Sequence, residues 1–357
     1  MSGEPDVSAA SRVRRTSRAG GRSREAAGVD RVAGIAERVA VLMGAGVPAT
    51  AAWRNLAAAD PADRVLAAAA SAASEGDPVA PAIDAAVRAA SADAARPGLR
   101  ALLRSRLPAG RRSLPEGLGA AEASGWQAVA AAWSVASATG APLAIALNDL
   151  AGALRDEAQL RREVQAALAG PLASARLVTA LPIVAVGFGV LLGFDSVGVL
   201  VAGPVGWTLL AAGGALLWAG ARWNRALVAR ADPAGAAPGI ALDLLAIAMS
   251  SGASVEASSR ATDVALRTHL PGADRAARDI AAVVEVAATA GAPVADLLRA
   301  EAHRRRRAAR AAGATRTAAL GVRLMLPLGA CILPAFVLLG VAPLMISVVT
   351  GTLGGAR

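Results

Sequence analysis

The residues that could carry chemistry in this sequence are few, and lysine is absent. All 37 basic residues are arginines; they outnumber the 27 acidic residues and give a net charge of +10. A Walker A phosphate loop requires a lysine on the β- and γ-phosphates, and Schiff-base catalysis requires a lysine amine. The sequence therefore excludes both kinds of site.

Metal and thiol chemistry have little support either. The only cysteine, Cys331, lies inside an apolar run, so one chain can form neither a disulfide nor a cysteine-based metal site. The two histidines, His269 and His303, lack the paired spacing of a metal site, and we expect both to be exposed polar residues of helices. No acid–base pair or nucleophilic triad is recognisable. We therefore expect no catalytic residue, cofactor or metal, and predict that the chain is not an enzyme.

One basic run is a candidate contact site. It consists of Arg304, Arg305, Arg306 and Arg307, on a helix expected after the Gly291–Pro293 break. Such a run is typical of a solvated helix face, and the alternative is a contact with a partner protein or with anionic lipid.

Composition indicates a membrane protein. Apolar residues make up 55% of the chain, and the mean hydropathy is +0.47. Three uncharged runs, Leu177–Phe194, Val197–Ala221 and Leu324–Val349, are each long enough to cross a hydrocarbon core of about 30 Å as a helix. Only Asp195 and Ser196 separate the first two runs, so these two predict a transmembrane helical hairpin.

Arginine placement predicts the orientation of the three helices. Arg176 precedes the hairpin, three arginines follow it closely, and Arg316 and Arg323 precede the last run, which only Arg357 follows. Arginine concentrates on the cytoplasmic side of membrane proteins. We therefore expect a multi-pass protein of the inner (cytoplasmic) cell membrane, with the N-terminus and soluble parts in the cytoplasm and the C-terminus outside.

The remaining sequence predicts helices throughout. We expect an all-α polytopic membrane protein with two cytoplasmic helical bundles and three transmembrane helices. The expected segments are a disordered arginine-rich tail (1–31), a first bundle (32–175), the hairpin (176–223), a second, shorter bundle (231–317) and a third transmembrane helix (324–349). The tail contains too few apolar residues to offset its ordering entropy. Weak attraction to anionic lipid is one function for it; nucleic-acid binding is a less favoured one, since no aromatic residue is interleaved.

The two bundles contain similar turns in the same order. Gly140 and Pro142 correspond to Gly291 and Pro293 at an offset of 151 residues, and Gly46 corresponds to Gly252 at an offset of 206. A glycine at a helix end accepts the left-handed conformation, and a proline just after it starts the next helix. In both halves a charged helix and an apolar run follow, which indicates an internal repeat.

Several stretches together resemble one family. They are Leu42–Pro48, Trp133–Leu147, Leu242–Gly252, Gly291–Leu298 and Leu326–Pro343. In order and placement they resemble the type II secretion F family, the inner-membrane platform proteins of secretion systems and type IV pili, and in particular those of tight-adherence (Flp) pili.

The resemblance implies a scaffold for the assembly of a pilus or a secretion pseudopilus. Its implied partners are a separate hexameric ATPase, pilin or pseudopilin subunits, membrane lipid, and further copies or other F-family proteins in an oligomer. No nucleic acid is expected. The alternative function is a small multipass transporter or channel, although the three apolar runs contain no charge that could couple to an ion.

Overall fold

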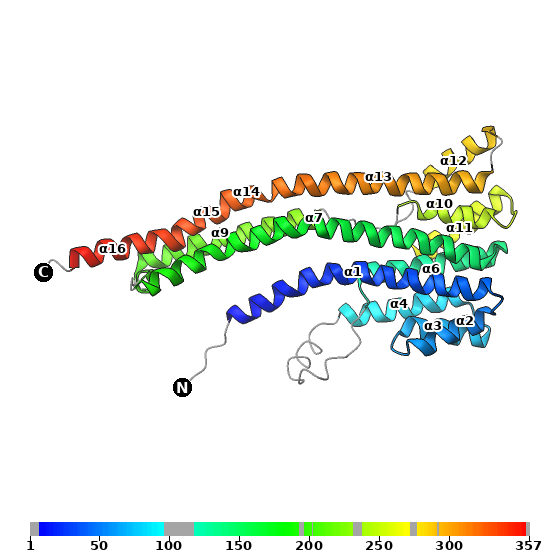
Figure 1. Cartoon of the computed structure of the whole chain (residues 1–357), viewed down its shortest axis with the longest axis horizontal. Coiled ribbons are helices and arrows are strands. Elements are labelled where there is room, and N and C mark those ends of the chain that lie inside the picture. The colour runs from blue at the N-terminus through cyan, green and yellow to red at the C-terminus, as the bar shows by residue number, and fades with distance from the viewer. Residues whose placement is uncertain are drawn as a thin grey trace. The chain divides into compact units, whose positions relative to one another are not determined.

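All the elements of the computed structural model are helices (Figure 1). The structure describes residues 7–95, 118–192, 196–201, 203–230, 238–271, 277–290 and 293–354, and no strand occurs in these ranges. The predicted all-α class is therefore confirmed. The chain divides into two compact units: unit 1 comprises Met1–Arg162 and Ala234–Arg310, and unit 2 comprises Glu163–Pro233 and Ala311–Arg357.

Unit 1 contains the charged and alanine-rich helices. They are α1 (Val7–Gly44), α2 (Ala49–Ala59), α3 (Arg64–Glu75), α4 (Val79–Ala95), α6 (Ala120–Thr139), α10 (Ile240–Met249), α11 (Val255–His269), α12 (Ala277–Ala290), and the first parts of α7 (Leu143–Leu191) and α13 (Val294–Arg323). α6 contacts α1, α4, α10 and α11. Apart from Glu122 and Gln127 its residues are apolar or small, as expected for a helix that neighbours cover on several sides.

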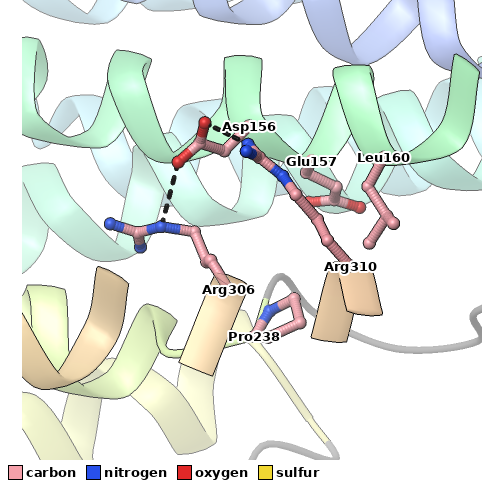
Figure 2. A pocket seen from close by; sticks show the side chains of 6 residues that line it. All are labelled: Asp156, Glu157, Leu160, Pro238, Arg306 and Arg310. Atoms are coloured by element: carbon pink, nitrogen blue, oxygen red, sulfur yellow. Dashed lines mark hydrogen bonds and ion pairs between the residues drawn. The ribbon is translucent and has the colours of Figure 1, made fainter. Parts of the chain in front are cut away.

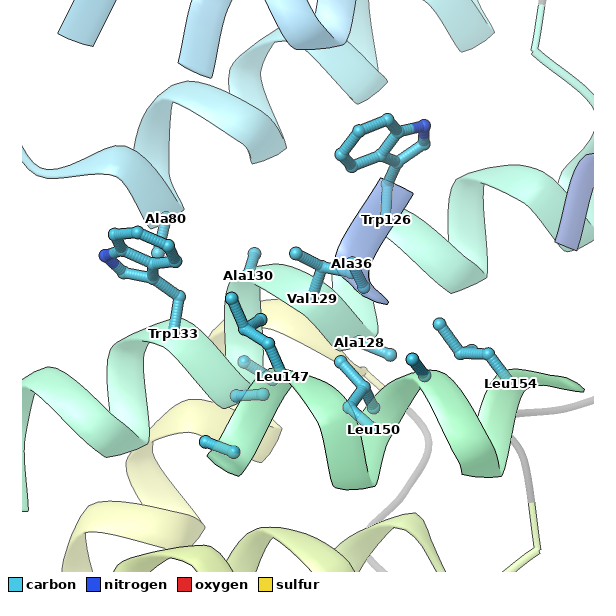
Figure 3. Close-up of a cluster of buried hydrophobic side chains, with 14 of the residues drawn as sticks. Ala36, Ala80, Trp126, Ala128, Val129, Ala130, Trp133, Leu147, Leu150 and Leu154 are labelled. Carbon is cyan, nitrogen blue, oxygen red and sulfur yellow. The ribbon is translucent and has the colours of Figure 1, made fainter. Parts of the chain in front are cut away.

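The core of unit 1 lies along α6 and the start of α7 (Figure 3). Trp126 of α6 and Leu147, Leu150 and Leu154 of α7 are fully or almost fully buried. The leucines follow the helical spacing of three and four residues, so they form one buried stripe on this helix. Trp133 meets another tryptophan, Trp53, with ring centroids 5.5 Å apart.

The first helix begins earlier than expected. The sequence predicted a disordered tail through residue 31, whereas α1 starts at Val7, and Ala26 and Val29 are buried in the core. Both residues extend the stripe of Val32 and Ile35 toward the N-terminus at helical spacing, so these positions gain apolar contacts that offset the ordering entropy.

The two expected bundles are not separate in the structure. α10 and α11 both pack against α6, so residues from both expected bundles share one core. The sequence of α10 explains this contact, because all nine residues from Ile240 to Ala248 are buried. Eight of these nine residues are apolar and the other is Asp243, so the helix requires cover on every side.

Unit 2 contains the apolar helices. They are the ends of α7 and α13, then α8 (Ser196–Val201), α9 (Pro204–Arg230), α14 (Met325–Pro327), α15 (Leu333–Phe336) and α16 (Ala342–Gly354), with π-helical segments at Leu328–Ile332 and Val337–Val341. Among the described residues, two helices are long and apolar enough to cross a membrane: Pro204–Leu227, and Val294–Val349 in its apolar part. Their most apolar windows are only 17% and 22% buried, unlike the core helix of a soluble protein. The expected first span is a shorter apolar helix, Ala180–Leu191, and Asp195 lies outside the described residues.

Each π-helical segment of unit 2 lies shortly before a proline. The Leu333 amide donates to the Leu328 carbonyl just before Pro334, and the Ala342 amide donates to the Val337 carbonyl just before Pro343. A proline inside a helix clashes with the preceding turn and removes one donor. The wider π turn relieves that crowding while the helix continues.

Candidate functional site: ion pairs between α7 and α13

The four arginines of the candidate basic run lie on different sides of their helix, so they differ in burial. Arg304 and Arg305 bind Glu301 of the same helix at 2.6 and 3.0 Å, and Arg307 is exposed. Arg306 is buried, because it extends the stripe of Leu298 and Ala302 at four-residue spacing. The run is therefore partly a surface and partly an internal ion-pairing site.

Arg306 connects two acidic residues from different helices. Its Nη1 donates to Oδ2 of Asp243 (α10) at 2.5 Å, and its Nε lies 3.2 Å from Oδ2 of Asp156 (α7). Arg310, one turn later, donates to the other oxygen of Asp156 (Figure 2). His303 accepts a further hydrogen bond from Arg306 Nη2 at 3.1 Å if its Nδ1 is unprotonated.

Burial raises the pKa of two acids at this cluster, Asp243 and Glu157. It raises the pKa of Asp243 from its ordinary 3.8 to about 6, and the positive charge of Arg306 opposes that rise. Burial likewise raises the pKa of Glu157, which Arg161 opposes across a contact of 2.7 Å. Asp156, Glu157, Arg306 and Arg310 line a small pocket together with Leu160 and Pro238.

The contacts between α7 and α13 form a parallel ladder of ion pairs. Arg299 Nε lies 3.1 Å from Asp149 Oδ2, and one heptad later Arg306 reaches Asp156. In both pairs the partners are 150 residues apart, within one residue of the repeat offset between Gly140 and Gly291. The helices that follow the two Gly-Ala-Pro turns therefore lie side by side in almost equivalent register.

A buried contact between a histidine and an aspartate also joins the two halves of the sequence. Nδ1 of His269 (α11) lies 2.5 Å from Oδ2 of Asp84 (α4), and both side chains are buried. The prediction that His269 is exposed is wrong, whereas His303 is exposed as predicted. The partners are 185 residues apart, so no local spacing indicated this contact.

The repeat turns adopt the backbone expected of glycine. Gly46, Gly140 and Gly252 have φ angles of +88°, +73° and +78°. A Cβ at any of the three would meet no atom within 4 Å, so the conformation alone requires glycine. Pro142 and Pro293 directly precede the first residues of α7 and α13, and Gly291 lies outside the described residues.

These contacts join neighbouring helices of unit 1. Within the part of the chain that the structure describes, no group of three or more histidine, cysteine, aspartate and glutamate residues could hold a metal ion. The acids of the cluster are engaged by arginines of neighbouring helices.

Comparison with protein families decides the kind of domain. Residues 35–191 match the family model described as "Type II secretion system (T2SS), protein F". This chain carries a type II secretion protein F domain. No curated protein and no solved structure matches the chain.

The protein F domain covers only part of the features described above. It includes the turns at Gly46 and Gly140, the core around α6, and α7 with Asp149 and Asp156. The arginines of α13 lie beyond it. Together with the two apolar helices, the match indicates an inner-membrane protein related to the platforms of type II secretion systems and type IV pili.

Proposed function

We propose that this chain is a non-enzymatic inner-membrane platform for the assembly of a type IV-like (Flp/Tad) pilus or a type II secretion pseudopilus. The observation that carries the proposal is the protein F domain at residues 35–191. Its helix α7 belongs to both units: residues 143–162 lie in the charged helical unit and residues 163–191 in the apolar one. A platform requires such a connection between a soluble face and the membrane.

The proposed topology has three membrane-spanning helices. They are residues 177–194, 197–221 and 324–349, of which the second and third overlap the two helices long enough to cross a bilayer. The arginines at their ends orient unit 1 and the N-terminus toward the cytoplasm and the C-terminus outward. Unit 1 is then accessible to cytoplasmic proteins.

Energy for assembly is proposed to come from a separate hexameric ATPase. A chain without lysine cannot form a Walker A loop. The ATPase binds unit 1, pilin or pseudopilin subunits are handed on by the membrane helices, and copies of the chain or other F-family proteins form the oligomer. Of the basic run, Arg304 and Arg307 remain exposed for such a contact.

The proposal is tested with the purified full-length protein and with the cells that make it. We expect no nucleotide hydrolysis by the protein alone, co-purification of an ATPase that has a Walker A lysine, and weaker co-purification of that ATPase with the Arg304→Gln/Arg307→Gln variant. Unchanged co-purification of the variant removes these two arginines from the proposal. Solute flux through liposomes that contain only this protein favours a transporter or channel and overturns the platform.

A further inference from the structure

Four arginines lie where the uncharged segments of unit 2 end. Arg222 directly follows the uncharged stretch of α9, with Arg225 one turn later, and Arg323 directly precedes the last uncharged stretch, with Arg316 two turns earlier. The structure places these two ends side by side, because the end of α9 packs against the start of the last uncharged stretch. A Cβ on Gly220 of α9 would lie 3.1 Å from Cys331 Cβ and 3.8 Å from the Pro327 carbonyl oxygen.

Packing further along the same helices confirms that the two ends lie side by side. Leu227 of α9 packs against a small cluster formed by Leu168, Leu320 and Leu324. α9 and the last helical segments therefore run antiparallel, and positions 222–225 of one lie beside positions 323–327 of the other. We call Arg222, Arg225, Arg316 and Arg323 the arginine belt.

The arginine belt is open to the surroundings of the protein. All four side chains, Arg222, Arg225, Arg316 and Arg323, are exposed. Among the residues that the structure describes, none of the four forms an ion pair with a carboxylate. The sequence supplies only three acidic residues to unit 2, namely Glu163, Asp195 and Asp232, and of these only Glu163 is described.

Two tryptophans accompany the belt on α9. Trp218 and Trp223 are 64% and 43% exposed, and the Arg222 guanidinium carbon lies 6.0 Å from the ring centroid of Trp218. Exposed tryptophan is typical of the boundary between hydrocarbon and headgroups. Immediately beyond the belt, Met325 and Leu326 are also exposed, as expected for side chains that contact lipid tails.

We propose that the arginine belt binds the phosphate groups of anionic phospholipids. Among the described residues these guanidinium groups have no carboxylate partner, and they lie beside exposed tryptophan and apolar side chains. That combination matches a ligand with a negative headgroup and hydrocarbon tails. The sequence suggested Arg304–Arg307 as a lipid contact, but three of these arginines pair with Glu301, Asp156 or Asp243. We therefore assign the lipid contact to the arginine belt instead. The inference does not rest on the proposed platform function.

The test measures lipid preference of the full-length protein in nanodiscs. The discs contain equal parts of phosphatidylcholine and phosphatidylglycerol, and native mass spectrometry of the protein released from them measures the apparent affinity for each lipid. Wild-type protein is expected to prefer phosphatidylglycerol. Each arginine near an anionic surface strengthens binding about fivefold, so the pairs Arg222→Gln/Arg225→Gln and Arg316→Gln/Arg323→Gln should each weaken phosphatidylglycerol binding by about 25-fold.

The matched control removes the same charge from unit 1. Arg54 and Arg260 are exposed there, so Arg54→Gln/Arg260→Gln should leave the lipid preference unchanged. The proposal is overturned if wild-type protein shows no preference, if the belt pairs keep it, or if the control loses as much. Should neither belt pair fold, a salt titration of the wild type decides: the preference must fall as ionic strength rises, and a salt-independent preference contradicts the proposal.

Discussion

Replacement of Arg306 by methionine tests the ion-pair cluster of unit 1. The change leaves Asp243, which is 6% exposed, without its partner at 2.5 Å. Removal of one member of a buried ion pair costs about 3–5 kcal/mol when the other remains charged. We therefore expect Arg306→Met to lower the free energy of unfolding by that amount at pH 8.

The cost of this substitution should depend on pH, with a sign set by Asp243. Its pKa is about 6 in the folded protein and 3.8 ordinarily, so the folded state holds the proton more tightly than the unfolded chain. On account of this group, stability is greatest at low pH and falls, by about 3 kcal/mol, as pH rises through about 6. At pH 5 the carboxyl group is largely neutral, so Arg306→Met should then cost only about 1–3 kcal/mol.

The assay is urea unfolding of the full-length protein in a non-ionic detergent, followed by tryptophan fluorescence at pH 5 and pH 8. Arg304→Met is the matched control, because Arg304 is exposed and its one ion-pair partner among the described residues is Glu301 of its own helix. It should change stability little at either pH. An equal cost of Arg306→Met at the two pH values, or an equal loss in the control, would refute the reasoning.

Two further predictions concern glycines. Gly140→Ala should lower the free energy of unfolding by about 1–2 kcal/mol, because φ is +73° there. Gly152→Ala, on the exposed face of α7, should raise the free energy of unfolding by up to about 1 kcal/mol. Urea unfolding measures both. A Cβ on Gly213 would overlap the side chain of Leu339, whereas one on Gly214 would meet nothing within 4 Å. Thermal unfolding in detergent should therefore show a lower Tm for Gly213→Ala, and an unchanged or higher Tm for Gly214→Ala; equal Tm values would contradict the packing of α9.

Local periodicity predicted the parts of the fold that depend on neighbours in sequence. The stripe of Leu147, Leu150 and Leu154 follows directly from a period of 3.6 residues. The same rule, applied further upstream, would have extended α1 to Ala26 and Val29. On α13 it would have identified Arg306 as buried, since four-residue steps from Leu298 lead to it.

Contacts between distant segments could not be predicted from spacing. Asp84 and His269 are ordinary polar residues of separate amphipathic helices, and only the packing of α10 and α11 onto the first half of the chain brings them together. Arg306 has the same residue type as its neighbours, so its partner Asp243 follows only from tertiary structure. The ladder between α7 and α13 had one signal, the almost equal offsets of the repeat and of the ion pairs.

Deletion of the gene, followed by complementation, tests the central claim most directly. The measurement is the amount of assembled filament, or of pseudopilus-dependent secreted protein, in the organism that encodes the chain. The platform account predicts that the deletion abolishes assembly while the partner ATPase stays intact, and that the full-length chain restores it. Normal assembly without the chain would contradict the account.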